Sequence, residues 1–234
     1  MTTDVSSGGR SAVRTRWMAW LFIVGSSLFA LGAVPFYSDA VGLRVCGVTF
    51  FIGSLFFTSA AFLQYREAVD ALPPVGDTQR RSFWVWAPRN LGWLAGAVQF
   101  AGTLWFNWST GNALRENLGA ALTDQRVWRP DAFGSIAFLV ASVLALRDAR
   151  GDVVAGRPKP RTWKMGVINL AGSIAFGVSA VAAFVIPSSG EVRNAELSNL
   201  GTLLGALCFL TAAILLLIPE TTDASIPAVR ERES

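Results

Sequence analysis

The chain has 234 residues, of which 52% are hydrophobic and only 15% are charged, and its formal net charge is +4. Its mean hydropathy of +0.44 is too high for a soluble globular domain of this length. The composition therefore excludes a soluble domain and predicts an integral membrane protein.

Six apolar stretches are long enough to cross a hydrocarbon core of about 30 Å, which takes roughly 20 helical residues. The stretches are unbroken rather than alternating in polarity, which favours helices over the strands of a barrel. In chain order the expected spans are 17–36, 45–64, 91–109, 132–147, 165–187 and 197–218. We therefore predict an all-α polytopic membrane protein with six transmembrane helices in three consecutive hairpins.

The expected spans divide the chain into hairpins, loops and tails. The hairpins are 17–65, 91–147 and 165–218, the loops between them are 66–90 and 148–164, and the tails are 1–16 and 219–234. The loop 66–90 is rich in proline, arginine and aromatic residues, which is typical of a segment in the headgroup layer. Leu114, Leu118 and Leu122 predict a short amphipathic helix within 110–130. Both tails lack hydrophobic periodicity, so we expect them to be disordered.

The cationic residues predict the orientation of the helices. If the N-terminus is cytoplasmic, fifteen of the 20 Lys and Arg residues fall on the inner side and five on the outer side. This asymmetry indicates that both termini are cytoplasmic. It also accounts for the net charge without a nucleic-acid partner, because the excess of cations meets the anionic inner leaflet. The preference for Arg over Lys is typical of a GC-rich bacterial genome, so we expect a bacterial inner (plasma) membrane.

A short motif recurs once in each expected span. It consists of Gly followed by Ser or Thr, two further residues and Phe, with Ala in place of Ser in the last span. Its glycine and phenylalanine positions are Gly25 and Phe29, Gly53 and Phe57, Gly102 and Phe106, Gly134 and Phe138, Gly172 and Phe176, and Gly205 and Phe209. The last span aligns with the second, which indicates an internal repeat of one hairpin.

The motif predicts a helix-packing seam. The residue seven positions after each glycine is Gly, Ala or Ser and lies on the same helical face. A stripe of small residues lets two backbones approach closely, and the Phe fills the space beside it. The alternative is that the stripes of small residues on the six helices converge on a central pathway.

Polar residues distinguish the later copies of the motif from the earlier ones. The residue three positions before the glycine is Phe22 or Phe50 in the first two spans, and is polar in the others. The candidate ligand-facing residues are these four polar positions and one further asparagine in the third span, namely Gln99, Asp131, Asn169, Thr202 and Asn107. Polar groups inside a membrane bundle are functional candidates because they are costly to bury unpaired. Each also has a structural interpretation: Gln99 and Asn169 could bond to a neighbouring helix, and Asp131 could cap the fourth helix.

The remaining reactive residues do not form a recognisable site. The sequence has no histidine, and its two cysteines, Cys46 and Cys208, lack metal-binding spacing. No cluster of acids, bases or nucleophiles lies within a span. We therefore expect no metal, no cofactor and no enzymatic activity.

The first hairpin resembles the YrhK-like family of small bacterial membrane proteins. The resemblance rests on the stretch from Phe50 to Gln64, preceded by a helix that contains Gly25, Ser26 and Phe29. It covers residues 17–65 best and 165–218 more weakly. It implies a two-helix hairpin unit and transfers no activity, substrate or site residue.

Two functions follow from these observations. The sequence favours a non-enzymatic membrane protein with a structural or partner-binding role, embedded in the lipid bilayer with other membrane proteins or further copies of itself as partners. The alternative is a small-solute transporter or channel with a polar stripe on the third to sixth helices. The expected hairpins repeat in the same orientation, whereas many secondary transporters have inverted repeats.

Overall fold

The computed structural model describes residues 4–73, 85–115, 118–155 and 160–218. Parts of the expected loops 66–90 and 148–164, and the tail 219–234, lie outside these ranges. Within them the long elements are helices: α1 (Asp4–Gly32), α3 (Leu43–Asp70), α4 (Leu91–Ala113), α6 (Arg129–Val154), α7 (Pro160–Ala182) and α8 (Ala195–Leu217). The short elements are α2 (Pro35–Val41), α5 (Ala120–Thr123) and the π-helix η1 (Asp124–Trp128).

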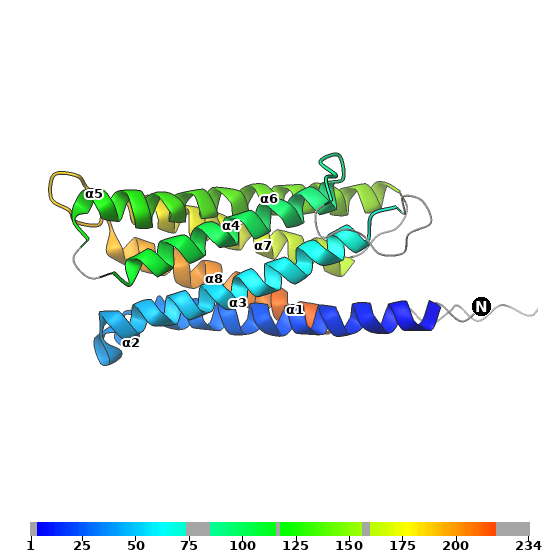
Figure 1. The fold of residues 1–234 in the computed structure, drawn as a ribbon, viewed down its shortest axis with the longest axis horizontal. Helices are drawn as coiled ribbons and strands as arrows, with labels where there is room; N and C mark the ends of the chain where they lie inside the picture. Colours follow the sequence, from blue (N-terminus) through cyan, green and yellow to red (C-terminus); the bar gives the residue numbers. More distant parts are fainter. Residues whose placement is uncertain (1–3, 74–84, 116–117, 156–159, 219–234) are drawn as a thin grey trace, which may run out of the picture.

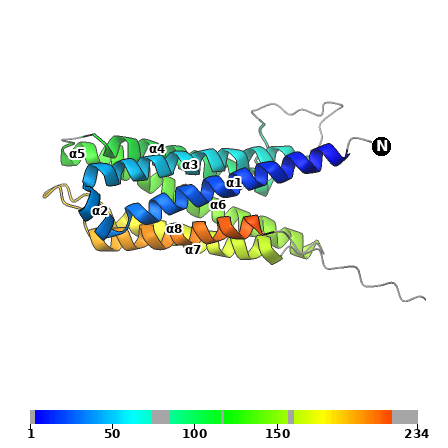
Figure 2. The same ribbon diagram turned by 90° about the horizontal axis from the view of Figure 1, so that it is seen from below.

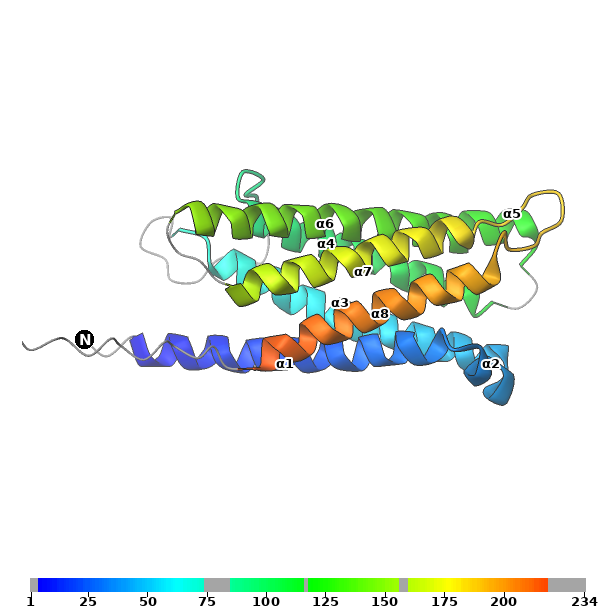
Figure 3. The same cartoon turned by 180° about the vertical axis from the view of Figure 1, so that it is seen from behind.

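The six long helices run side by side along the long axis of the molecule (Figure 1). In order around the ring, α1 packs on α3, α3 on α4, α4 on α6, α6 on α7, α7 on α8, and α8 on α1. The view from below shows α1 next to both α3 and α8 (Figure 2). We call the end that holds the start of α1 and the end of α8 the termini end, and the opposite end, with α2 and α5, the turn end (Figure 3).

Five helical segments are long and apolar enough to cross a membrane: Ser11–Gly32, Leu43–Asp70, Ala120–Gly151, Pro160–Ala182 and Ala195–Leu217. The chain is therefore all-α in its long elements and has the composition of a membrane protein, as predicted. The helix α4 does not reach the same hydropathy, although it has 23 residues.

The N-terminal tail was predicted wrongly over residues 4–16. The helix α1 begins at Asp4, and α3 continues past the expected end of its span to Asp70. Polar contacts hold these extensions together: Arg14 Nη1 lies 2.5 Å from Asp70 Oδ2, and Thr15 Oγ1 donates a hydrogen bond of 3.3 Å to Glu67. Polarity alone predicted disorder, but these side chains pair with a second helix.

The expected amphipathic helix within 110–130 does not form as a separate element. The helix α4 ends at Ala113, and from Ala120 the chain is helical through η1 into α6. Pro130 has no N–H, and in a regular α-helix its ring would clash with a carbonyl one turn earlier. The wider π-helix just before Pro130 avoids this clash. Asp131 therefore lies inside a continuous helix, and its predicted role as a helix cap is wrong.

The fifth span is shorter than predicted, because α7 ends at Ala182 rather than near 187. The chain then forms a tight turn in which Val185 and Val192 make an antiparallel bridge. Gly190 adopts a φ of +73°, which favours glycine. Asn194 then caps α8 by accepting a 2.9 Å hydrogen bond from the amide of Leu197.

The motif glycines face one another within three helix pairs, α1 with α3, α4 with α6, and α7 with α8. A Cβ added to Gly25 would lie 3.1 Å from the carbonyl oxygen of Gly53, and one added to Gly53 would lie 3.3 Å from that of Gly25. The other reciprocal pairs are Gly102 with Gly134, and Gly172 with Gly205. The backbones thus meet most closely at the motif, as the packing-seam prediction requires.

Each pair also places a phenylalanine ring against the partner's glycine. A Cβ on Gly205 would lie 2.6 Å from Cδ2 of Phe176, and a Cβ on Gly25 would lie 2.9 Å from Cδ2 of Phe57. Real Cβ atoms do not approach other atoms so closely, so only glycine leaves room for the ring. In lipid such close packing is a main source of helix association.

We predict that Gly205→Ala destabilises the protein by about 1 to 3 kcal/mol, because the added methyl group overlaps the Phe176 ring. Gly177→Ala, also in a helix, is the matched control, since a Cβ there meets nothing within 4 Å. Thermal unfolding in detergent measures both. Equal melting temperatures for the two variants would contradict the seam.

Candidate functional site

The six motif phenylalanines meet on the axis of the ring. All are buried, and together with Ala206 they form one hydrophobic cluster. Three come from helices that run from the termini end to the turn end, and three from helices that run back. We call the cluster of Phe29, Phe57, Phe106, Phe138, Phe176 and Phe209 the phenylalanine core.

The rings form two triangles. The ring centroids of Phe29, Phe106 and Phe176 lie 6.0 to 6.4 Å apart. Those of Phe57, Phe138 and Phe209 lie 5.6 to 6.1 Å apart. Five of these six pairs are edge-to-face and the sixth is tilted, and aromatic pairs in such geometries contribute about 0.5 to 1.5 kcal/mol beyond their buried area.

The phenylalanine core closes the axis. The space between the rings amounts to about 10 Å³, which is at the lower limit for one water molecule. On each side of the core there is a larger cavity. We call the cavity of about 110 Å³ at the termini end the termini-side cavity, and that of about 270 Å³ at the turn end the turn-side cavity.

The residues three positions before the motif glycines line these two cavities. Phe22, Gln99 and Asn169, on helices of one direction, line the termini-side cavity. The corresponding residues on helices of the other direction, Phe50, Asp131 and Thr202, line the turn-side cavity. The same sequence position faces opposite ends because neighbouring helices are antiparallel. Four of the five candidate residues thus lie on the axis, but in two separate groups.

Asn107 has a different environment. Its side-chain oxygen accepts a 3.1 Å hydrogen bond from Thr58 Oγ1, which joins α4 to α3. The same threonine donates a longer bond of 3.4 Å to the carbonyl of Thr103. Asn107 is absent from the residues that line the two cavities. Its geometry is that of a contact between helices.

At the turn-side cavity, α1, α4 and α7 each present the residue seven positions after their motif glycine, and the three residues have different neighbours. Beside α1, the ring of Phe50 covers Gly32, where a Cβ would lie 2.9 Å from the ring. Beside α7, the hydroxyls of Thr202 and Ser179 lie 2.8 Å apart. Beside α4, Ser109 occupies the position that corresponds to Ser179 and Gly32.

At this third place Asp131 has no bonded partner. Ser109 donates its hydroxyl to the carbonyl of Val127 at 2.8 Å, a group that the π-helix brings within reach. The carboxyl of Asp131 makes no hydrogen bond or ion pair within the described part of the chain. It lines the turn-side cavity as the one ionisable side chain among the lining residues.

The hydroxyls next to the motif glycines join neighbouring helix pairs. Ser54 in α3 lies 3.0 Å from the hydroxyl of Thr110 in α4. Ser173 in α7 lies 2.8 Å from Ser142 in α6 and donates to the carbonyl of Phe138 at 3.2 Å. Ser26 in α1 is buried without a partner in the described ranges. Among the described residues, hydroxyl contacts next to the motif glycines therefore link α3 to α4 and α6 to α7, and no such contact links α1 to α8.

Sequence reasoning did not identify the cavity-lining hydroxyls Thr110 and Ser198, nor Trp128. The sequence marks Thr110 and Ser198 as cavity residues only by their distance along the helix from a motif glycine. Trp128 lies in the π-helix, which the sequence did not predict. No group of three Cys, Asp or Glu side chains able to hold a metal ion occurs in the ranges that the structure describes.

Comparison with known proteins gives no relative for this site. No family model, curated protein sequence or solved structure matches the chain.

We predict that Phe176→Ala lowers the free energy of unfolding by about 3 to 5 kcal/mol, because it leaves a cavity beside the three motif rings that contact Phe176, those of Phe29, Phe106 and Phe209. Phe133→Ala is the control, since Phe133 is 52% exposed on the outside of the ring. Denaturant or thermal unfolding in the same detergent compares the two. A Phe176→Ala variant as stable as Phe133→Ala would show that the core does not hold the bundle together.

Proposed function

We propose that all six long helices cross the membrane of a bacterial cell, with both termini in the cytoplasm. For α4, the support is its place in the ring between α3 and α6 and its exposed apolar residues, Leu104, Trp105 and Trp108. Its low hydropathy comes partly from Gln99 and Asn107, which face a cavity or a neighbouring helix rather than lipid.

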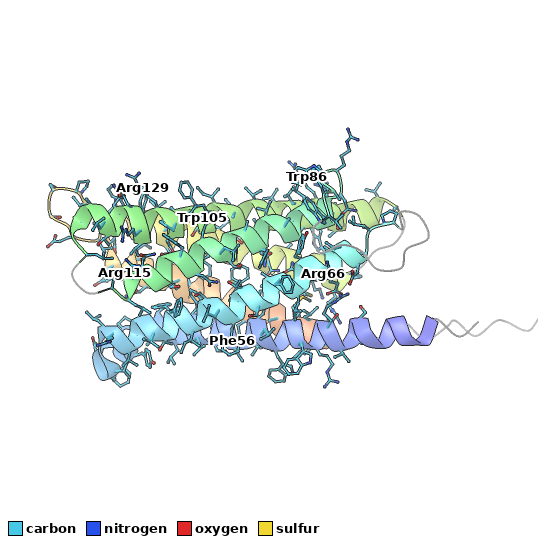
Figure 4. The ribbon with its side chains drawn as sticks, viewed as in Figure 1. Phe56, Arg66, Trp86, Trp105, Arg115 and Arg129 are labelled. Atoms are coloured by element: carbon cyan, nitrogen blue, oxygen red, sulfur yellow. The ribbon has the colours of Figure 1, made fainter. Side chains whose placement is uncertain are left out.

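Arginine side chains lie at both ends of the ring, as expected of helices that cross a membrane from end to end. Arg66 and Trp86 lie at the termini end, Arg115 and Arg129 at the turn end, and Trp105 between them on the outside (Figure 4). The motif glycines of α7 and α8 lie near the middle of those helices. The phenylalanine core would then lie near the centre of the bilayer, with one cavity toward each side.

The position of α4 can be tested by labelling cysteines from outside the cell. We expect Gly119→Cys, at the turn end, to react with a membrane-impermeant maleimide in intact cells. Pro88→Cys, before the start of α4, should react only after the membrane is permeabilised. Labelling of both positions from the same side would show that α4 does not cross.

The function that this geometry supports best is a non-enzymatic pathway for a small solute along the ring axis, closed in this conformation by the phenylalanine core. The observation that carries the proposal is the pair of cavities with polar linings, one on each side of a barrier made only of side chains. A bundle with a purely structural role has no need of a carboxyl on its axis, since a charge within the membrane is costly.

Asp131 is deep enough for this cost to apply. It precedes Phe138 by seven residues, or about 10 Å along a helix. If the core lies at the bilayer centre, Asp131 lies inside a hydrocarbon layer whose half-thickness is about 15 Å. A carboxyl there needs either a partner or a function.

The packing suggests how the axis could open. Contacts are more extensive within the three helix pairs than between them. The reciprocal glycine contacts also lie within pairs. Each pair is therefore the rigid unit. Outward movement of the pairs would separate the rings within both triangles of phenylalanines without breaking a glycine seam.

Solute flux into vesicles tests the pathway. Reconstituted Phe138→Ala protein should admit a small solute such as urea, glycerol or methylammonium faster than the wild type, because part of the barrier is gone. Phe133→Ala, on the lipid-facing side, should leave the rate unchanged. If folded Phe138→Ala protein admits none of these solutes faster, the pathway is wrong.

That outcome would favour the other function, a structural or partner-binding role. The apolar residues exposed around the ring support this alternative, because they can contact lipid, other membrane proteins or further copies of the chain. The three similar helix pairs support an internal repeat, and membership of the YrhK-like family stays a prediction.

A further inference from the structure

The turn-side cavity has the chemistry of a cation site. Of the residues that line it, Asp131 is the only one with an ionisable side chain, and no Lys or Arg side chain is among them. Its carboxyl makes no hydrogen bond or ion pair in the described part of the chain, so both of its oxygens are open to a ligand. A cation bound beside the carboxyl favours its ionised form and is attracted by it, whereas an anion would oppose that ionisation.

Three of the six hydroxyls that line the cavity act as acceptors rather than donors toward a ligand. Ser109, Thr110 and Ser179 each donate their one hydroxyl proton to a backbone carbonyl at 2.8 Å. A hydroxyl has one proton and two lone pairs, so these groups can still accept hydrogen bonds. They therefore suit a ligand that donates hydrogen bonds.

Aromatic rings form the rest of the wall. Phe29, Phe106 and Phe176, one triangle of the phenylalanine core, border the cavity, and Phe50 and Trp128 also line it. The faces of aromatic rings carry a partial negative charge and attract cations. The aromatic share of the wall favours an organic cation over a bare metal ion, which prefers oxygen ligands on all sides.

We propose that the turn-side cavity binds a small organic ammonium ion, with its charge beside Asp131 and its alkyl part against the phenylalanine core. The volume of about 270 Å³ suits a cation of a few carbon atoms. The inference names the class of solute for the proposed pathway and rests on that pathway for passage, whereas binding needs only the cavity.

Equilibrium dialysis of the purified full-length protein against radiolabelled methylammonium and tetramethylammonium tests the site. Wild-type protein should bind one or both saturably, and excess sodium chloride should not displace them. Asp131→Asn, which keeps the size of the side chain, should weaken binding at least about tenfold. Asp39→Asn is the matched control, because Asp39 lies in α2 at the same end, is exposed and does not line the cavity.

A second variant covers the case in which Asp131→Asn does not fold. Phe50→Leu removes a ring from the wall, and should weaken tetramethylammonium binding severalfold. Tighter binding of tetramethylammonium would indicate that the aromatic rings contribute most of the affinity. Tighter binding of methylammonium would indicate that the hydroxyls contribute most. Both results support the site.

Three results would overturn it: no saturable binding to the wild type, undiminished binding to folded Asp131→Asn, or undiminished tetramethylammonium binding to Phe50→Leu where Asp131→Asn cannot be obtained. The flux experiment is separate. If the wild type binds ammonium ions but the Phe138→Ala variant admits no solute faster, the cation site is supported and the pathway is wrong.

Discussion

The structure depends on one contact, made twice in each of the three helix pairs: a phenylalanine ring of one helix lies in the space that a glycine leaves on its partner. In the pair α7 and α8, the ring of Phe176 lies so close to Gly205 that a single methyl group would overlap it. In lipid, burial of apolar surface does not drive helices together, because the tails are as apolar as the side chains. Shape complementarity at the glycines therefore has to supply much of the association.

This contact also determines where the rings point. Side chains on a helix lean toward its N-terminus, so rings on antiparallel helices lean toward each other across the seam. Three pairs arranged around one axis then bring six rings together, which closes the centre and leaves space toward each end. The barrier and the two cavities are consequences of the same packing, and the polar residues three positions before each glycine face whichever end their helix direction dictates.

Much of this arrangement could be predicted from the sequence, because the motif is local and regular. The motif predicted the glycine seams, and the hydrophobic runs predicted the helical class. The meeting of the six rings and the division of Gln99 and Asn169 from Asp131 and Thr202 could not be predicted, since both depend on how the pairs pack. The prediction for residues 4–16 failed because their pairing with α3 is a non-local contact. The prediction for residues 110–130 failed because a π-helix, such as the one before Pro130, is rare. Cavity residues such as Trp128 carried no motif of their own.

The central claim is that Gly205 and Phe176 fit each other, and a double-mutant cycle between Gly205→Ala and Phe176→Leu measures this directly. Leucine is shorter than the ring, so it should make room for the added methyl group. The two changes together should then destabilise the protein less than the sum of their separate effects, by at least about 0.5 kcal/mol. The same cycle with lipid-facing Phe133→Leu should show additive effects. Additive effects for Gly205 and Phe176 as well would contradict the account.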